Sequence, residues 1–401
     1  MKASSPRSQV PGGTLQVAGG LEDRAEARVT VECVQDPFRF SALRSEWRNL
    51  LQDSASNNPF LTWEWLYAWW SHFGVAGSLR LMLVRADGEL IAIAPFRLIA
   101  TPLYWFSRLE FLGTGEAGSD YLDLIVRHGA EARALTALAD FLSEQKLALR
   151  LTHLPPNSLV AHLSARLAEG GWASSFAVDG TCPIVDLTGH TFDSFLGSLG
   201  PSHRANIRRR LRALERDFAV RFERITQHDD RRVMLDALAA FHGRRYAGRG
   251  GSTAFTSPAA RAFHEEATRR ALDHGWLRMY ALRVNGAVAA VMYGFALNGR
   301  FYFYQHGYDE TYAGHSIGLV LMALTIRTAI DEGAGEFDML WGTEAYKARW
   351  ARSTRLLQRV DLFPVHLGGT VHRHAVEARR GVSQLARRVL SLGSPGADRV
   401  S

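Results

Sequence analysis

Residues able to do proton chemistry gather in one stretch near the end of the chain, FDMLWGTEAYKARW at 337–350. Asp338 alternates with Phe337 and Met339, so its side chain lies on the opposite face of a strand from theirs. Gly342 then marks the carboxyl end of that strand, the edge at which open α/β sheets collect ligands. The candidate catalytic residues delivered there are Asp338, Glu344, Tyr346 and Lys347. The alternative interpretation is a polar loop closed by an ion pair.

An aromatic strand at 300–308 precedes this stretch. Because side chains alternate along a strand, one face carries Tyr302, Tyr304, His306 and Tyr308. Such a face suits the wall of a cleft, in which His306 or a tyrosine handles a proton. A half-exposed sheet face favours the same residue types, which is the alternative.

A loop that contains two glycines follows the aromatic strand and leads into a helix. Its residues are Ala313, Gly314, His315, Ser316, Ile317 and Gly318. Unpaired N–H groups and the helix dipole make such a helix start an anion site, and glycine lets a phosphate approach the backbone. We interpret these six residues as a cofactor-binding loop; an ordinary helix cap is the alternative.

A three-stranded meander must position these groups. The pattern predicts strands at Leu277–Val284, Ala287–Leu297 and Arg300–Tyr308, joined by two Asn-Gly pairs that favour type I′ turns. Helices are expected at 201–217, 229–245 and 257–274 before the meander, and at 317–332 after it. A strand at 336–341 then follows a crossover, so it pairs in parallel. A last strand at 356–363 is expected to close this domain.

The first half of the chain repeats this order. A strand, an Asp-Gly turn and a second strand at 81–94 match 279–291, and an aromatic third strand is expected at 104–106. The first copy has no comparable loop at a helix start, so we interpret it as a degenerate copy whose loop at 113–121 lines the cleft between the domains. The domains are expected at 29–188 and 189–366, after a disordered leader at 1–28 and before a basic tail at 367–401.

The composition narrows the class of protein. The formal net charge of +7 favours an anionic partner such as a phosphorylated cofactor, a nucleic acid or a membrane surface. Cys33 and Cys182 have no metal-binding or redox spacing, so no metal site is expected. No apolar signal region and no window near ~18 apolar residues is present, and we therefore expect a cytoplasmic protein.

The motifs at 304–308, 314–318 and 337–350 resemble those of the CelD-like acetyltransferase family, a GNAT branch related to the FemAB/FemX peptidoglycan aminoacyl transferases. The NPFLTWEW run at 58–65 and the basic segment at 202–210 are similar to it as well. The resemblance implies an α/β (α+β) fold of tandem GNAT-like domains, each a mixed, mostly antiparallel sheet flanked by helices. The second domain is the expected catalytic one.

The resemblance also implies an activity: transfer of an acyl group, in the first place acetyl, from acyl-CoA to an amine or hydroxyl. The acceptor would be a small molecule or a saccharide or envelope precursor. The thioester arm would lie along 300–308 and the pyrophosphate at 313–318. Tyr346-Lys347 resembles the aromatic-lysine pair of the FemX type, which puts Lys347 at the transfer site.

We expect Asp338, Glu344 or His306 to accept a proton, and Lys347 with Tyr346 to polarise the carbonyl or hold an acidic acceptor. Tyr304 and Trp63 are the candidate substrate-binding residues. The Gln/Arg-x-x-Gly spacing of the GNAT pyrophosphate loop is absent. Two alternatives therefore stay open: a transferase that uses aminoacyl-tRNA, and a binding module without catalysis.

Overall fold

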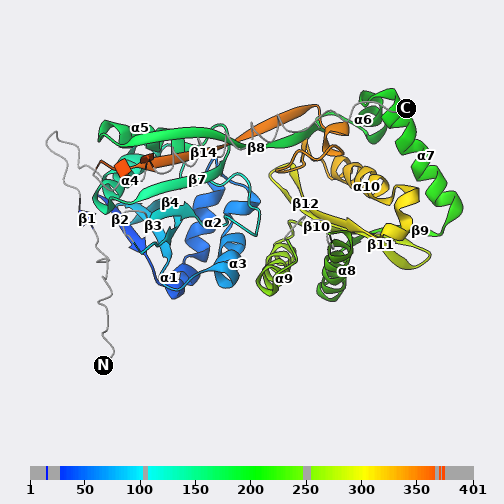
Figure 1. Cartoon of the computed structure of the whole chain (residues 1–401), viewed down its shortest axis with the longest axis horizontal. Helices are drawn as coiled ribbons and strands as arrows, with labels where there is room; N and C mark the ends of the chain where they lie inside the picture. The colour runs from blue at the N-terminus through cyan, green and yellow to red at the C-terminus, as the bar shows by residue number, and fades with distance from the viewer. Residues whose placement is uncertain are drawn as a thin grey trace.

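One continuous fourteen-stranded sheet runs through the computed structural model, which describes residues 15–16, 28–102, 107–246, 254–365, 370–371 and 373–374 (Figure 1). The strand order is β1-β2-β3-β4-β5-β7-β14-β8-β13-β12-β11-β10-β9, and β6 pairs with β4. The strands of the first half are β1 (Leu15–Gln16), β2 (Val29–Val34), β3 (Leu79–Ala86), β4 (Glu89–Ile99), β5 (Arg108–Phe111), β6 (Ile125–Val126), β7 (Ala148–Leu154) and β8 (Ala173–Asp186). Those of the second half are β9 (Val220–Ile225), β10 (Leu277–Val284), β11 (Ala287–Leu297), β12 (Arg300–Tyr308), β13 (Glu336–Asp338) and β14 (Ser353–Phe363).

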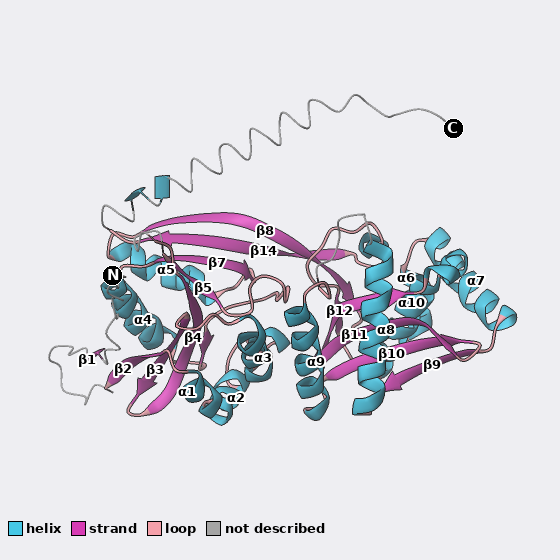
Figure 2. Cartoon of the chain, turned by 60° about the horizontal axis from the view of Figure 1, so that its bottom comes forward, coloured by secondary structure: helices cyan, strands magenta, loops and turns pink. Residues whose placement is uncertain are grey.

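Helices cover both faces of this sheet (Figure 2). The first half carries α1 (Pro37–Ala42), α2 (Arg44–Gln52), the short η1 (Pro59–Leu61), α3 (Trp63–Phe73), α4 (Glu131–Gln145) and α5 (Leu159–Glu169). The second half carries α6 (Phe192–Ser198), α7 (Pro201–Asp217), α8 (His228–Tyr246), α9 (Pro258–Asp273), η3 (Glu310–His315), α10 (Ile317–Asp331) and η4 (Lys347–Arg349). In the second half α8 and α9 lie on one face, and α10 with α6 and α7 lies on the other (Figure 1).

The two halves have the same topology, which confirms the tandem arrangement expected from the sequence repeat. In each, an antiparallel meander (β3-β4-β5 and β10-β11-β12) is followed by a crossover helix and a parallel strand. The parallel pairs are β5 with β7 and β12 with β13. The predicted strand at 104–106 lies outside the described residues; β5 is the third strand of the first meander.

The predicted elements of the second half agree closely with the structure. The three meander strands have the predicted bounds, because Asn285-Gly286 and Asn298-Gly299 adopt the positive φ angles that their turns require. Ser257 caps α9 by accepting the Ala260 amide. The strand predicted at 336–341 is shorter and ends at Asp338, since Leu340 has a φ of +55° and Gly342 one of +138°.

The last strand does not close the second half as expected. β14 instead pairs antiparallel with β8 along its whole length and with β7 of the first half. β8 in turn reaches from the first half to β13 through Ile184–Asp186. Backbone hydrogen bonding therefore continues from one half into the other through β8 and β14.

Aromatic packing also crosses the junction. The ring of Trp65 on α3 lies edge-on to Phe263, Phe295 and Tyr304 of the second half, with centroids 4.9, 5.5 and 5.3 Å apart. Such pairs each add about 0.5–1.5 kcal/mol beyond the area that they bury. The two halves thus share one apolar core.

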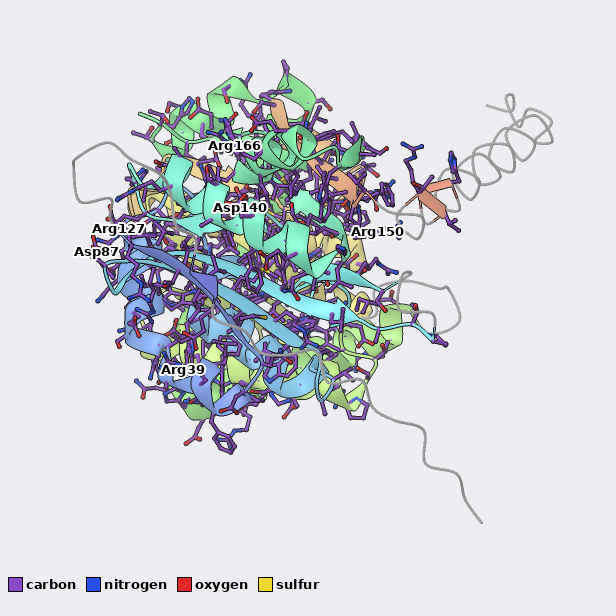
Figure 3. The ribbon with its side chains drawn as sticks, turned by 90° about the vertical axis from the view of Figure 1, so that its left-hand side faces the viewer. Arg39, Asp87, Arg127, Asp140, Arg150 and Arg166 are labelled. Atoms are coloured by element: carbon purple, nitrogen blue, oxygen red, sulfur yellow. The ribbon has the colours of Figure 1, made fainter. Side chains whose placement is uncertain are left out.

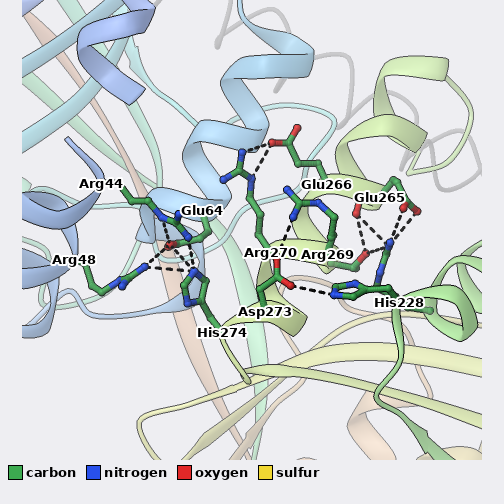
Figure 4. A network of polar contacts seen from close by, with 12 residues as sticks. Arg44, Arg48, Glu64, His228, Glu265, Glu266, Arg269, Arg270, Asp273 and His274 are labelled. Carbon is green, nitrogen blue, oxygen red and sulfur yellow. Dashed lines mark hydrogen bonds and ion pairs between the residues drawn. The ribbon is translucent and has the colours of Figure 1, made fainter. Parts of the chain in front are cut away.

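A polar network joins α2 and α3 to α9 at the edge of this core (Figure 4). The Glu64 carboxylate, 5% exposed, accepts from Arg44 at 3.2 Å and Arg48 at 3.0 Å, and lies 3.0 Å from His274. Burial opposes ionisation, but the backbone and Arg48 hydrogen bonds hold the pKa of Glu64 below its usual value. The network fixes how the halves face each other.

The opposite end of the first half carries solvated charge. Arg39, Asp87, Arg127, Asp140, Arg150 and Arg166 project there (Figure 3). Arg39 and Arg127 pair with Glu32 and Glu89. Exposed pairs of this kind contribute about 0–1 kcal/mol each.

Three observations concern the described residues only. None of their helices is long and apolar enough to cross a membrane. No cluster of three or more His, Cys, Asp or Glu side chains among them is arranged to hold a metal ion. Cys33 and Cys182 are both free thiols.

Candidate active site

Two cavities lie on either side of the far end of β12. The first, here called the helix cavity, has a volume of about 300 Å³, and its lining includes His306, Tyr308, Ser316, Ile317, Gly318 and Tyr346. The second, the interdomain cavity, has about 550 Å³ and is lined by Asp120, His153, Tyr304, Glu344 and Lys347 together with His306 and Tyr346. His306 and Tyr346 line both cavities, and these two residues are here called the partition between them.

The end of β12 is free to form this partition because its neighbour stops early. β13 pairs with β12 only from Arg300 to Tyr302, whereas β12 continues to Tyr308. A β-bulge also interrupts the other side, where Tyr293 faces Gln305 and Gly294 faces Phe303. A Cβ on Gly294 would lie 2.1 Å from the Tyr302 carbonyl oxygen, so this close approach requires glycine.

The His306 and Tyr346 rings meet at the partition, with centroids 5.5 Å apart. Phe303 packs on the same imidazole at 5.1 Å. The His306 carbonyl is 2.9 Å from Nε2 of His242 on α8. The strand, the loop after β13 and α8 thus hold the partition from three sides.

The start of α10 faces the helix cavity. Ser316 adopts a φ of +55° ahead of the helix and makes no side-chain cap. Its carbonyl accepts from the Leu319 and Val320 amides, so among the described residues of the first turn the Ile317 and Gly318 amides are the ones without a hydrogen-bond acceptor. Of the six residues predicted to bind a cofactor, Ala313, Ser316, Ile317 and Gly318 line the cavity. Tyr308 ring carbons lie 3.2 Å from where a Cβ on Gly318 would be.

Gly314 and His315 are turned away from this cavity. The Gly314 carbonyl accepts from Arg210 at 2.8 Å, and the His315 ring packs against Phe218 at 4.9 Å. The short η3 helix, which the sequence did not predict, is a 3₁₀ helix with three residues per turn. Ala313 and Ser316 therefore share the side toward the cavity, and Gly314 and His315 between them lie on other sides. Four of the six predicted residues thus line the helix cavity, and Gly314 and His315 do not.

Lys347 is held at the floor of the interdomain cavity, with only 4% of its surface exposed. Its ammonium donates to the carbonyls of Trp341 (2.8 Å) and Leu340 (3.3 Å) and lies 3.2 Å from the Glu344 carboxylate. Glu344 is half exposed, so it can exchange this partner for water. The site therefore presents a buried ammonium with one replaceable partner.

Asp338, a predicted base, lies behind the cavities and is not among their lining residues. Its fully buried carboxylate accepts from the Tyr121 hydroxyl (2.6 Å), the Leu340 amide (2.8 Å) and Arg355 (3.1 Å). Burial raises the pKa of Asp338 to about 7, although these three donors act in the opposite direction. Asp338 is therefore placed to hold the loop after β13 rather than to contact a substrate.

This carboxylate gives stability a measurable pH dependence. Because the folded-state pKa of Asp338 is raised, its contribution to stability is full below pH ~3.9, its unfolded value, and is lost as pH rises through about 7. Asp338→Asn should remove this pH dependence. Its slope in the wild-type protein is at most about 1.4 kcal/mol of unfolding free energy per pH unit. Urea unfolding of both proteins at several pH values measures it; equal slopes would contradict the assignment.

The two candidate substrate-binding residues differ in position. Tyr304 lines the interdomain cavity and donates its hydroxyl to the Ala117 carbonyl. Trp63 lies in the core of the α3–α9 junction, 4% exposed, where it stacks on Tyr67 and donates to the Phe40 carbonyl. Trp63 is therefore brought to neither cavity.

The first half supplies a wall that the sequence indicated only in part. The loop at 113–121 lines the interdomain cavity, as expected, through Gly115, Glu116, Ala117, Gly118 and Asp120. His153 on β7, which no sequence motif indicated, joins it there. Asp120 accepts the Trp341 amide at 2.8 Å, so this wall is bonded to the loop that carries Lys347.

The two cavities differ in charge. The helix cavity continues past Asn206 and Arg349 into a groove of about 740 Å³ that is bordered by His203 and Arg209. The interdomain cavity is lined by the carboxylates of Glu116, Asp120 and Glu344. An anionic ligand is therefore favoured on the α10 side and a cationic one on the side of the first half.

Comparison with known proteins agrees with this geometry. Residues 201–348 match the model of the acetyltransferase (GNAT) domain family, and no curated protein matches the chain. The crystal structure of FemX has a TM-score of 0.57 at 12% identity, over 79% of this chain and 95% of that one.

Two further solved structures are also similar in fold. The C-terminal domain of the putative synthetase from Agrobacterium fabrum has a TM-score of 0.52 at 12% identity, over 85% of this chain and 96% of that one. L-PGS from Bacillus licheniformis has a TM-score of 0.50 at 16% identity, over 84% of this chain and 96% of that one. These likenesses concern the fold, whereas the family model covers β12, α10 and the loop that carries Lys347. Residues 201–348, in the second half of the chain, thus match the GNAT acetyltransferase domain family, which supports an acyltransferase.

Proposed function

We propose that the protein transfers an acyl group, in the first place acetyl, from acyl-CoA in the helix cavity to an amine or hydroxyl in the interdomain cavity. The observation that carries this proposal is that His306 and Tyr346 line both cavities. Acyl transfer needs a thioester carbonyl and a nucleophile held together at one point. Two binding spaces that meet at one partition provide that arrangement.

The charge of the α10 side suits a phosphorylated donor. The Ile317 and Gly318 amides at the start of α10 and its dipole would hold a pyrophosphate. Arg209 and Arg349 along the adjoining groove would bind further phosphate oxygens. The thioester would then extend along the end of β12 toward His306.

Transfer would occur at the partition. Tyr346 and the Lys347 ammonium would stabilise the negative charge that develops on the carbonyl oxygen when the nucleophile attacks. Lys347 can do so because Glu344 is half exposed and free to leave it. The resemblance to the CelD-like family favours a saccharide or envelope precursor as the acceptor.

Calorimetry with acetyl-CoA tests the donor site. Replacing Gly318 by leucine should weaken acetyl-CoA binding about tenfold or more, since the new side chain enters the cavity beside Tyr308. Gly314→Ala is the matched control, because nothing lies within 4 Å of that position and it faces away from the cavity. Unchanged affinity in the Gly318 variant would move the phosphate site elsewhere.

A second donor is favoured by one feature of α7. Exposed arginines at 208, 209, 212 and 216 give this helix a basic surface beside the groove, which also suits an aminoacyl-tRNA. Binding of charged tRNA with a steep loss of affinity between low and high salt would support that donor. Acetyl-CoA binding without release of free CoA, for any acceptor, would instead indicate a binding module.

A further inference from the structure

His153 is aimed into the interdomain cavity by an irregular backbone. Leu151 and Leu154 of β7 face Val360 and Gln358 of β14, so two residues of β7 lie opposite a single residue of β14. His153 occupies this bulge with a φ of +58°, which is rare outside glycine. Its amide donates to Asp179 at 3.0 Å and its carbonyl accepts from Leu122 at 3.1 Å. Bulges and strained residues that are clamped in this way recur at functional sites, where they redirect a side chain.

The His153 ring is paired with a carboxylate that cannot turn. Nδ1 lies 3.3 Å from Oδ1 of Asp120, and the other oxygen of Asp120 accepts the Trp341 amide. Asp120 is 2% exposed. A carboxylate against Nδ1 favours the tautomer whose proton is on that nitrogen, which leaves Nε2 as the acceptor. Within the described part of the chain no hydrogen bond engages Nε2, and the side chain, 26% exposed, lines the cavity.

We propose that His153, oriented by Asp120, takes the proton from a primary ammonium acceptor bound in the interdomain cavity and so prepares it to attack the acyl donor. This inference rests on the proposed function above and deepens it: the first half supplies a catalytic residue, and the acceptor is a cationic amine. Asp120 is a positioning residue for His153.

The surroundings match that acceptor. Glu116 and Asp120 line the same cavity, and the charges of Glu344 and Lys347 offset each other, so the space favours a positive ligand. An alkyl ammonium with a pKa of about 10.4 is protonated near pH 7 and has no lone pair to attack with. A base on the acceptor side is therefore required. His153 lines the interdomain cavity alone, whereas His306 also lines the helix cavity.

The step balances as follows. Nε2 of His153 takes one proton from the ammonium, and the free amine nitrogen bonds to the thioester carbon. The carbon–sulfur bond breaks, and the thiolate receives the second proton from the nitrogen. His153 then releases its proton to solvent. The products are an amide and free CoA.

The charges around His153 set the pH at which it can act. Burial alone lowers the pKa of His153, but the Asp120 carboxylate beside Nδ1 and the charge of Asp179 raise it above the usual value overall. Arg359 on β14 lies 4.0 Å from Asp179 and moderates that charge; His242 and Lys347 line the cavity opposite. Since the base must be neutral, the rate should fall as pH drops through this raised pKa.

The test compares two nucleophiles on the full chain with acetyl-CoA as donor and thiol release as readout. The first is 1,4-diaminobutane, which is protonated at neutral pH, and the second is hydroxylamine, which is uncharged there. His153→Asn, chosen because asparagine tolerates positive φ, should lower kcat for the diamine about 100-fold and for hydroxylamine far less. Asp120→Asn can still accept the Trp341 amide but removes the charge beside His153. It should therefore shift the acidic limb of the pH–rate profile with the diamine to lower pH.

The outcomes separate the inference from the proposed function. Equal losses for both nucleophiles in His153→Asn would show a structural role and overturn the inference alone. Full activity with the diamine in that variant would do the same. No transfer from acetyl-CoA to either nucleophile by the wild-type chain would overturn the proposed function and the inference with it. A selective loss with the diamine, together with the shifted limb, supports both.

Discussion

Replacing Gly342 by alanine should lower kcat for acyl transfer about 100-fold while the chain still folds. Gly342 has a φ of +138°, and a Cβ there would lie 2.1 Å from the Glu344 carboxylate and 2.7 Å from the Lys347 ammonium. Both atoms are the far ends of flexible side chains, so they would move and the backbone would stay. A displacement of about 1 Å at a reacting centre costs on the order of 100-fold in rate, whereas the strained φ costs about 1–3 kcal/mol of stability.

The matched control for this variant is Gly335→Ala. Gly335 precedes the same strand, but a Cβ there meets only Thr188 at 3.6 Å and the Gly299 carbonyl at 4.0 Å, which are ordinary contacts. Steady-state kinetics and thermal unfolding of both variants decide the result. A wild-type kcat in the Gly342 variant would show that the positions of Glu344 and Lys347 do not matter to the reaction.

The sequence predicted the meander of the second half to the residue because its signals are local. Asn285-Gly286 and Asn298-Gly299 determine where the strands reverse, and Ser257 with Pro258 determines where α9 begins. Each signal acts within four residues of chain. Tertiary contacts had little to override in these elements.

The partners of β14 could not be predicted in this way. Its residues form a strand from their own pattern, but whether it pairs inside the second half or with β7 and β8 depends on segments about 170–210 residues earlier. The early end of β13 is a similar case, since Leu340 adopts a positive φ that a leucine in the sequence does not predict. Long-range pairing and strained backbone are decided by packing.

The candidate site was predicted on one side only. His306, Tyr346, Lys347 and Glu344 lie together as expected, because they come from one strand and the loop beside it. His153 was missed, since a single histidine in a strand carries no motif and only the β7 bulge turns it inward. Trp63 lines neither cavity, since an aromatic run on a helix indicates burial as readily as binding.

Lys347→Met should reduce kcat about 100- to 1,000-fold with little change in acetyl-CoA affinity. Removal of one preorganised donor from a developing oxyanion costs rates of this order. The helix cavity, where the donor would bind, does not include Lys347, so binding should survive. Kinetics with saturating acetyl-CoA, together with calorimetry of its binding, would check both parts.

Two features of Lys347 allow its structural and chemical roles to be separated. Its ammonium also donates to the carbonyls of Leu340 and Trp341, so the methionine variant loses some stability, and kcat must be expressed per folded molecule from thermal unfolding. Glu344→Gln is the matched control: it removes the replaceable carboxylate and leaves both carbonyl contacts, so its kcat should stay within about tenfold of wild type. If Lys347→Met were less stable but catalysed at the wild-type rate per folded molecule, the ammonium would only brace the loop. If Glu344→Gln lost as much activity as Lys347→Met, the carboxylate rather than the ammonium would be the reacting group.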